Sequence, residues 1–302
     1  MQQTPEAWSV FTSPCGRMRL GWRLLLFALL TFTIAAASTL VLPASQVAGS
    51  AALLVGALVA GLLLLVLEGR PAGALGFHVG REAVSASLLG LALGAAVALL
   101  VVTMIAAAGG LVWSPQPGTW GAWLVGGAGA LLFFALPAAA EEVFLRGYPI
   151  QALAEEWGAW PAILVTAGAF GALHLGNPGV TAIGMLNVAV AGVFLGVVYL
   201  KTLSLWWASG AHLGWNWVHG YLADVPVSGL ELMDAPLYDG VVRGPAWLGG
   251  GAFGPEGSLV ATAVVAAAAI VCWRARWLRP SEAALATRPL ASPLSIQLGT
   301  HA

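Results

Sequence analysis

Three short sequence patterns place ionisable and amide side chains inside apolar stretches of the chain. The patterns are Glu-Glu-x-x-x-Arg, Phe-x-x-x-His and His-x-x-x-Asn, formed by Glu141, Glu142, Arg146, Phe170, His174, His212 and Asn216. Ionisable groups are costly inside a membrane and are functional candidates by default. A carboxylate there can take a proton from water, so these residue types point to hydrolysis. The alternative is a pair of glutamates that reach the cytoplasmic interface at a helix end.

Helical spacing gives different directions to the side chains of the first pattern. Glu142 and Arg146 are four residues apart, hence on one face of a helix and able to form an ion pair. Glu141 projects about 100° away and is free for another task. We therefore expect Glu141 to be catalytic, and Glu142 with Arg146 to fix helix register in a supporting role.

The second and third patterns supply the remaining candidates. Phe170, a supporting residue, shares a helix face with His174. His174 can polarise the attacking water or bind a metal, although a lone membrane histidine is often only a hydrogen-bond partner between helices. His212 and Asn216 also share a face and are suited to donate to a developing oxyanion. His219 follows on that face and is expected at the outer membrane interface.

The three patterns lie at similar depth in the predicted membrane. At about 1.5 Å per residue, the first two lie roughly 21 Å and the third roughly 16 Å from the residue taken as the inner boundary of its helix. The residue pairs counted are Glu141 with Glu155, His174 with Trp160, and His212 with Lys201. The three depths agree to within about one helical turn. They therefore lie inside a hydrocarbon core of about 30 Å.

Composition identifies the medium in which these residues lie. Of 302 residues, 59% are hydrophobic and 8% charged, with a mean hydropathy of +0.88, whereas soluble domains carry about a quarter charged residues. The net charge of -1 gives no reason to expect nucleic acid. We predict an all-α polytopic membrane protein with about eight transmembrane helices. The candidate spans are 22–42, 47–67, 84–108, 121–142, 160–175, 180–200, 203–222 and 258–273.

Arginine and lysine orient these spans. With the N-terminus cytoplasmic, ten basic residues fall on inner segments and one, Arg243, on an outer loop, as the positive-inside rule requires. We expect cytoplasmic N- and C-termini and a multi-pass location in the cell (plasma or inner) membrane. Pro137 is expected to break or kink the fourth span.

These spans divide the chain into six expected segments. They are a cytoplasmic N-terminal segment at 1–21, N-terminal transmembrane helices at 22–120, a catalytic transmembrane core at 121–222, a solvated extracytoplasmic loop at 223–257, a last transmembrane helix at 258–280 and a disordered cytoplasmic tail at 281–302.

At the three patterns the sequence resembles the CPBP family of intramembrane proteases, also called the Abi or type II CAAX prenyl endopeptidase family. That family shows the same three patterns in the same order, and here each falls in a predicted span. The residues that flank Arg146 and Asn216 also look like it. The resemblance covers residues 138–220.

The resemblance implies a helical membrane protease that hydrolyses a peptide bond of a membrane-associated peptide, of CAAX type or bacteriocin-like. It implies that Glu141 with His174 activates water and that His212 with Asn216 stabilises the oxyanion. The family has been described both as metalloproteases and as metal-independent, glutamate-dependent enzymes. Glu141, His174 and His212 would also serve as three zinc ligands with an open position, so zinc is the one cofactor in question.

Two other functions stay open. A proton-coupled transporter would use Glu and His as a relay, but it predicts charged groups at many depths and usually an internal repeat. A non-catalytic immunity or interaction protein would carry a degenerate site. Other protease types are not favoured, since the sequence has no His-Glu-x-x-His pattern and no Asp in a span.

Overall fold

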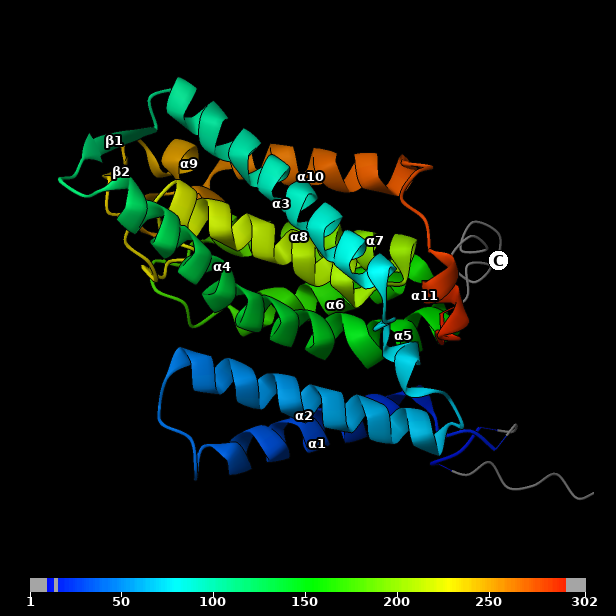
Figure 1. Cartoon of the computed structure of the whole chain (residues 1–302). Helices are drawn as coiled ribbons and strands as arrows, with labels where there is room; N and C mark the ends of the chain where they lie inside the picture. Colours follow the sequence, from blue (N-terminus) through cyan, green and yellow to red (C-terminus); the bar gives the residue numbers. More distant parts are fainter. Residues whose placement is uncertain (1–9, 14–15, 292–302) are drawn as a thin grey trace, which may run out of the picture.

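Long apolar helices make up most of the chain in the computed structural model, which describes residues 10–13 and 16–291 (Figure 1). Among these residues, five helices are long and apolar enough to cross a membrane. They are α1 (Leu20–Ser38), α2 (Gln46–Leu67), α3 (Arg81–Ala107), the helix Trp120–Trp157 and α7 (Ala182–Thr202). Three shorter helices complete the bundle: α6 (Ala159–Leu173), α8 (Leu205–Trp217) and α10 (Leu259–Arg274). The helical multi-pass character is confirmed, while eight spans and cytoplasmic termini stay predictions.

The fourth span continues past Pro137 instead of ending there. α4 (Trp120–Glu142) contains Pro137, passes into the π-helical turn η2 (Val143–Gly147) and continues as α5 (Tyr148–Trp157). These 38 residues extend about 57 Å, well beyond a hydrocarbon core of about 30 Å. α4 runs obliquely across its neighbours in Figure 1. A second π-helical turn, η3 (Val218–Leu222), follows α8.

The connection between η3 and α10 is folded and holds buried as well as exposed residues, while its extracytoplasmic position stays a prediction. Its strand β2 (Tyr238–Val242) pairs antiparallel with β1 (Leu111–Pro115), which follows α3. Three short helical segments come next: α9 (Ala246–Gly249), η4 (Gly251–Phe253) and η5 (Pro255–Gly257). Gly250 and Gly254 have φ of 90° and 80°, which only glycine adopts readily. This path buries Phe253 and Glu256.

The segment after α10 departs from expectation. The predicted disordered tail at 281–302 instead includes helix α11 (Glu282–Ala286). Further on, the backbone N–H of Leu290 donates to Gln151 Oε1 at 2.9 Å. Gln151 is fully buried and also donates from Nε2 to Ala74 O, in the short helix η1 (Ala72–Leu75), because buried amides need partners. The prediction is wrong for 281–291, and residues 292–302 lie outside the described residues.

A cluster of opposite charges fixes the α1–α2 hairpin at one end of the bundle. Arg23 of α1 is 1% exposed, and its Nε lies 2.8 Å from both Tyr148 Oη and Glu68 Oε1. The same guanidinium pairs at 3.3 Å with Glu155 of α5, which also bonds to Arg17. A buried guanidinium requires such compensation. The cluster therefore joins α1, α2 and α5 at the predicted inner boundary.

Glycines bring α3 and α8 into backbone contact. Gly90 and Gly94 of α3 face Gly210 and Gly214 of α8, four residues apart in each helix. A Cβ at Gly94 would lie 1.8 Å from Ala211 O, so no side chain fits there. Small residues at this spacing let membrane helices pack closely. Because α8 carries the His-x-x-x-Asn pattern, this contact sets the position of that pattern.

We predict that Gly94→Val dislodges α8 and destabilises the protein. Overpacking of this kind costs about 3 kcal/mol, because the new side chain overlaps a backbone carbonyl. Purified Gly94→Val should therefore unfold in detergent at a lower temperature than the wild-type protein. Gly129→Val is the matched control, since nothing lies within 4 Å of a Cβ at Gly129. Equal stability of the two variants would contradict close α3–α8 packing.

Candidate active site

Two adjacent glutamates, Glu141 and Glu142, form the end of α4, and Glu142 is the buried one. Glu142 is 0% exposed. Its Oε1 accepts hydrogen bonds from Arg146 Nη1 at 2.9 Å and from His212 Nδ1 at 3.0 Å. The predicted pairing of Glu142 with Arg146 is therefore present, and it extends to α8.

Arg146 stands in the π-helical turn η2 and is also 0% exposed. Its Nη2 donates to Gly192 O of α7 at 3.0 Å, and its guanidinium lies 4.7 Å from the ring centroid of Phe170 on α6. A carboxylate, a carbonyl and an aromatic face thus meet the buried charge. Together with the Glu142–His212 bond, these contacts join α4, α6, α7 and α8 around one ion pair.

His212 presents one ring nitrogen to each glutamate. Because a carboxylate only accepts hydrogen bonds, the Nδ1 that faces Glu142 carries a proton. The other nitrogen, Nε2, lies 3.9 Å from Glu141 Oε2. In the neutral ring Nε2 is an acceptor, so it donates to an oxyanion only in the imidazolium form. The predicted oxyanion role of His212 therefore requires a doubly protonated ring.

Glu141 points away from the ion pair, as its position one residue earlier predicts. Its side chain is 25% exposed and lines a pocket. Its Oε2 is buried and has no hydrogen-bond partner among the described residues. His212 Nε2, at 3.9 Å, is beyond hydrogen-bond distance. A carboxylate that lines a pocket and has no hydrogen bond to another side chain is suited to accept a proton from water.

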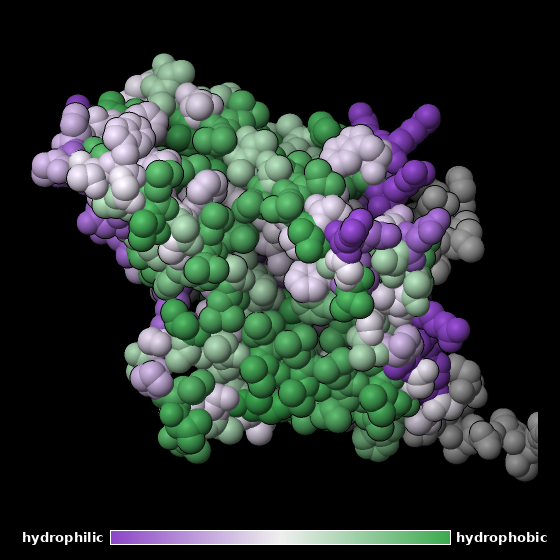
Figure 2. Space-filling view, viewed as in Figure 1, coloured by the Kyte–Doolittle hydropathy of each residue, from purple (hydrophilic) through white to green (hydrophobic). Residues whose placement is uncertain are grey.

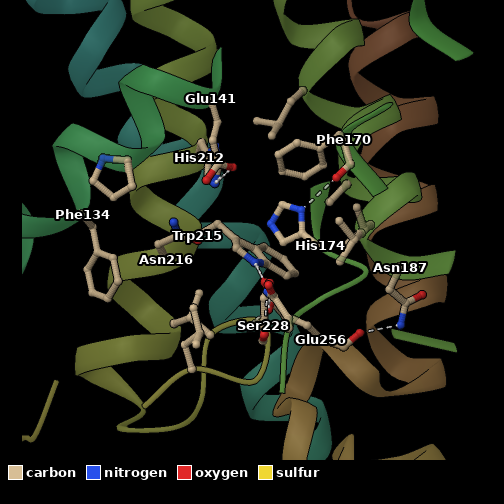
Figure 3. A pocket seen from close by; sticks show the side chains of 18 of the residues that line it. Phe134, Glu141, Phe170, His174, Asn187, His212, Trp215, Asn216, Ser228 and Glu256 are labelled. Atoms are coloured by element: carbon tan, nitrogen blue, oxygen red, sulfur yellow. Dashed lines mark hydrogen bonds and ion pairs between the residues drawn. The ribbon is translucent and has the colours of Figure 1, made fainter. Parts of the chain in front are cut away.

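His174 ends α6 and faces the same pocket (Figure 3). Its Nδ1 lies 2.8 Å from Phe170 O. Since a carbonyl is an acceptor, Nδ1 carries the proton, and Nε2 of the neutral ring keeps a lone pair. The Phe170 ring lies 4.8 Å from the His174 ring and 5.8 Å from the His212 ring, between centroids. Phe170 therefore contacts both histidines and the guanidinium of the ion pair.

The candidate residues surround one pocket, whose empty space, together with the part open to solvent, is about 870 Å³. Glu141, Phe170, His174, His212 and Asn216 all line it. The apolar part of the lining consists of Phe134, Pro137, Val188, Ala191, Phe194, Leu195, Ala211, Val227, Leu230, Leu232, Ala261 and Val265. The structure thus brings the predicted pocket residues to one place, with the ion pair outside the lining.

Glu256 lines the same pocket, and sequence reasoning missed it. It is 7% exposed and accepts hydrogen bonds from Trp215 Nε1 at 2.5 Å, from Ser228 Oγ at 2.8 Å and from the Ser228 N–H. Trp215 directly precedes Asn216, so Glu256 ties the 223–257 connection to the part of α8 that carries the His-x-x-x-Asn pattern. A glutamate in a stretch rich in Gly and Pro carries no pattern that signals burial.

Asn187 is a second pocket residue that was missed. Its Nδ2 donates to Glu256 O and Ser258 O, each at 2.7 Å, and its Oδ1 accepts from Thr262 Oγ1 at 2.6 Å. Asn187 therefore joins α7 to η5 and to the start of α10. A lone asparagine inside an apolar span was the signal that could have found it.

His219 corrects another expectation. Predicted at the outer interface, it is 0% exposed, and its Nδ1 bonds to Trp215 O at 3.0 Å. The π-helical turn η3 leads into the folded 223–257 connection, which covers this part of the chain instead of leaving it at the interface.

The zinc set considered from the sequence is not assembled. In the part of the chain that the structure describes, the ligand atoms that gather within 4.8 Å of one another belong to Asp224, Asp234 and Asp239. This group lies in the 223–257 connection, outside the pocket. Burial raises the pKa of Asp224, although that carboxyl accepts two backbone N–H bonds.

Comparison with known proteins supplies a family for the centre of the chain. The family model described as Rce1-like, type II CAAX prenyl endopeptidase, matches residues 120–218. No curated protein and no solved structure matches the chain. The matched segment runs from the start of α4 to the start of η3 and contains all three sequence patterns. The family resemblance is thereby confirmed over this segment.

We predict that Arg146→Met costs about 3–5 kcal/mol of stability, because Glu142 is left buried without its cation. The double variant Glu142→Gln/Arg146→Met should recover part of that loss, since no charge is then stranded. Thermal unfolding in detergent measures both effects. Strictly additive losses would show that Glu142 and Arg146 are not coupled.

Proposed function

We propose that this protein, with its Rce1-like type II CAAX prenyl endopeptidase segment, is an intramembrane endopeptidase that cleaves a membrane-associated peptide. One observation carries the proposal. Polar side chains from three separate patterns, on α4, α6 and α8, face a single cavity between apolar helices. Such walls suit the apolar side chains of a peptide that enters from the bilayer.

Glu141 acts as the general base in this proposal. A water molecule between Glu141 and His174 gives one proton to the Glu141 carboxylate and donates its other hydrogen to His174 Nε2. The water oxygen then attacks the carbonyl carbon of the peptide bond, and the carbonyl oxygen becomes an oxyanion. The hydrogen bond from His174 Nδ1 to Phe170 O supports the tautomer that this role needs.

His212 and Asn216 act on the oxyanion. The Asn216 amide donates one hydrogen bond, and the His212 ring donates another from Nε2 in its imidazolium form. When the tetrahedral intermediate collapses, the carbon–nitrogen bond breaks and the proton held by Glu141 passes to the leaving amine. The products are a new carboxyl terminus and a new amino terminus. The ion pair of Glu142 with Arg146 positions His212 and takes no proton.

A proton-coupled transporter is less well supported. A relay needs ionisable groups that follow one another across the membrane, whereas Glu141, His174 and His212 surround one cavity. A protease uses such convergence directly, because base, water and oxyanion donors must meet at one peptide bond.

We predict that Glu141→Gln and His174→Ala each reduce cleavage about 100-fold or more, as expected for loss of a base or of the group that orients water. The assay uses a reporter peptide, namely a quenched-fluorescent copy of a membrane peptide whose fragments mass spectrometry finds only in cells containing the protein. Both variants should keep the wild-type unfolding temperature in detergent.

Glu231→Gln is the control for this experiment. It makes the same chemical change at an exposed glutamate of the 223–257 connection, outside the pocket lining, and should cleave at the wild-type rate. Cleavage of the reporter peptide by folded Glu141→Gln at the wild-type rate would overturn the proposed mechanism.

We also predict that removal of divalent metal leaves cleavage unchanged, because the candidate zinc ligands do not form a group in the structure. Purified protein is dialysed exhaustively against a chelator, its metal content is measured, and the reporter peptide is then added. Loss of activity that returns with one equivalent of Zn²⁺ would contradict this prediction.

A further inference from the structure

Basic residues collect at one end of the helix bundle. Arg17 bonds to Glu155 of α5 there, and Lys201, in the last turn of α7, donates to Trp273 O beside the end of α10. This is the end at which α5 and α11 lie in Figure 1. Figure 2 shows strongly hydrophilic residues at that end, next to a broad hydrophobic surface. A concentration of arginine and lysine is typical of the cytoplasmic side of a membrane protein.

The opposite end of the bundle is rich in acidic residues and poor in basic ones. There β1, β2 and α9 lie together, and the 223–257 connection folds over the helix ends (Figure 1). This connection contains five carboxyl residues and one basic residue, Arg243. The difference in charge between the two ends is the asymmetry that orients helical membrane proteins.

The pocket is lined from this acidic end. Its lining includes Gln46, the first residue of α2, and Asn177, in the connection between α6 and α7. Leu230 and Leu232 of the 223–257 connection line it as well, and both are partly exposed. Asn177 Nδ2 donates to Ser228 O at 2.9 Å and so ties two of these connections together. Figure 3 shows the pocket running from Glu141 and His212 toward Ser228 and Glu256.

Toward the basic end, the turn of helix that follows Glu141 is packed inside the protein. Every residue from 143 to 148 is buried, and Val143, Arg146 and Tyr148 are 0% exposed. The buried ion pair of Glu142 with Arg146 follows Glu141 along the same helix in that direction. Beyond it, Tyr148 is bonded into the charge cluster of Arg23 and Glu68. Packed side chains therefore separate Glu141 from the end at which basic residues collect.

From these observations we infer that the pocket opens to the extracytoplasmic side of the membrane. The direction of opening determines the class of substrate, and this second step rests on the proposed function. The peptide bond that is cut lies in the outer half of the bilayer or at its outer surface, as in the outward end of a transmembrane helix or an exported membrane-bound peptide. A peptide that approaches from the cytoplasm meets these packed side chains.

Labelling of single cysteines tests the direction of opening. Both native cysteines are replaced (Cys15→Ser, Cys272→Ala), and Leu232→Cys or Arg276→Cys is introduced into the full chain. Leu232 lines the pocket, whereas Arg276 is exposed just after α10 at the basic end. A membrane-impermeant sulfonated maleimide is added to right-side-out and to inside-out vesicles.

The inference predicts that Leu232→Cys is labelled in right-side-out vesicles and Arg276→Cys in inside-out vesicles. Labelling of Leu232→Cys only in inside-out vesicles would overturn the inference, and so would no labelling of Leu232→Cys from either side. Detergent-solubilised Leu232→Cys, which should react, controls for the reactivity of the thiol itself.

Cleavage of the reporter peptide separates this inference from the proposed function. Solubilised protein should cut the peptide, and right-side-out vesicles should cut peptide that is added outside. Cleavage by solubilised protein and by inside-out vesicles alone would overturn outward opening and leave the protease intact. No cleavage in detergent, together with outward labelling of Leu232→Cys, would overturn the proposed function and leave the direction of opening intact.

Discussion

The buried ion pair of Glu142 with Arg146 is the interaction on which the arrangement of the site depends. Both side chains are 0% exposed, and their contacts reach α6, α7 and α8 through Phe170, Gly192 and His212. In a medium of low dielectric constant, neither charge can be left without the other. The four helices must therefore stay in the register that closes the pair. The pocket exists because Glu141, one residue earlier on the helix, is directed away from this closed cluster.

Close backbone packing supplies the rest of the precision. Membrane helices gain little from burying apolar surface, since lipid is equally apolar, so shape and hydrogen bonds decide how they pack. Gly94 and Gly214 let α3 and α8 approach to backbone contact, and this places His212 within reach of Glu142. Glu256 fixes the other end of the catalytic face through Trp215. The position of α8 is thus determined at three points by contacts of different chemical kinds.

The sequence predicts those contacts of the site that join residues about one turn apart on the same helix. A spacing of four residues correctly pairs Glu142 with Arg146, and depth counted along each helix brings three patterns to one level. Glu256 was out of reach, because its partner Trp215 is 41 residues away and no periodicity relates a loop to a helix. Whether Pro137 breaks the helix or only kinks it was left undecided for a different reason. A proline marks a lost hydrogen bond, but neighbouring helices decide whether the helix ends there.

Reactivity in this site follows from what the structure leaves unpaired. Glu142 is committed to two donors, and His174 Nδ1 is committed to Phe170 O. Glu141 Oε2 and Glu142 Oε2 both have no hydrogen-bond partner among the described residues, but only Glu141 lines the pocket, as His174 does. A base that was already hydrogen-bonded would have to break that bond before it could accept a proton. The ion pair thus engages Glu142, Arg146 and His212, and leaves Glu141, one residue earlier, without a hydrogen bond from them in the pocket lining.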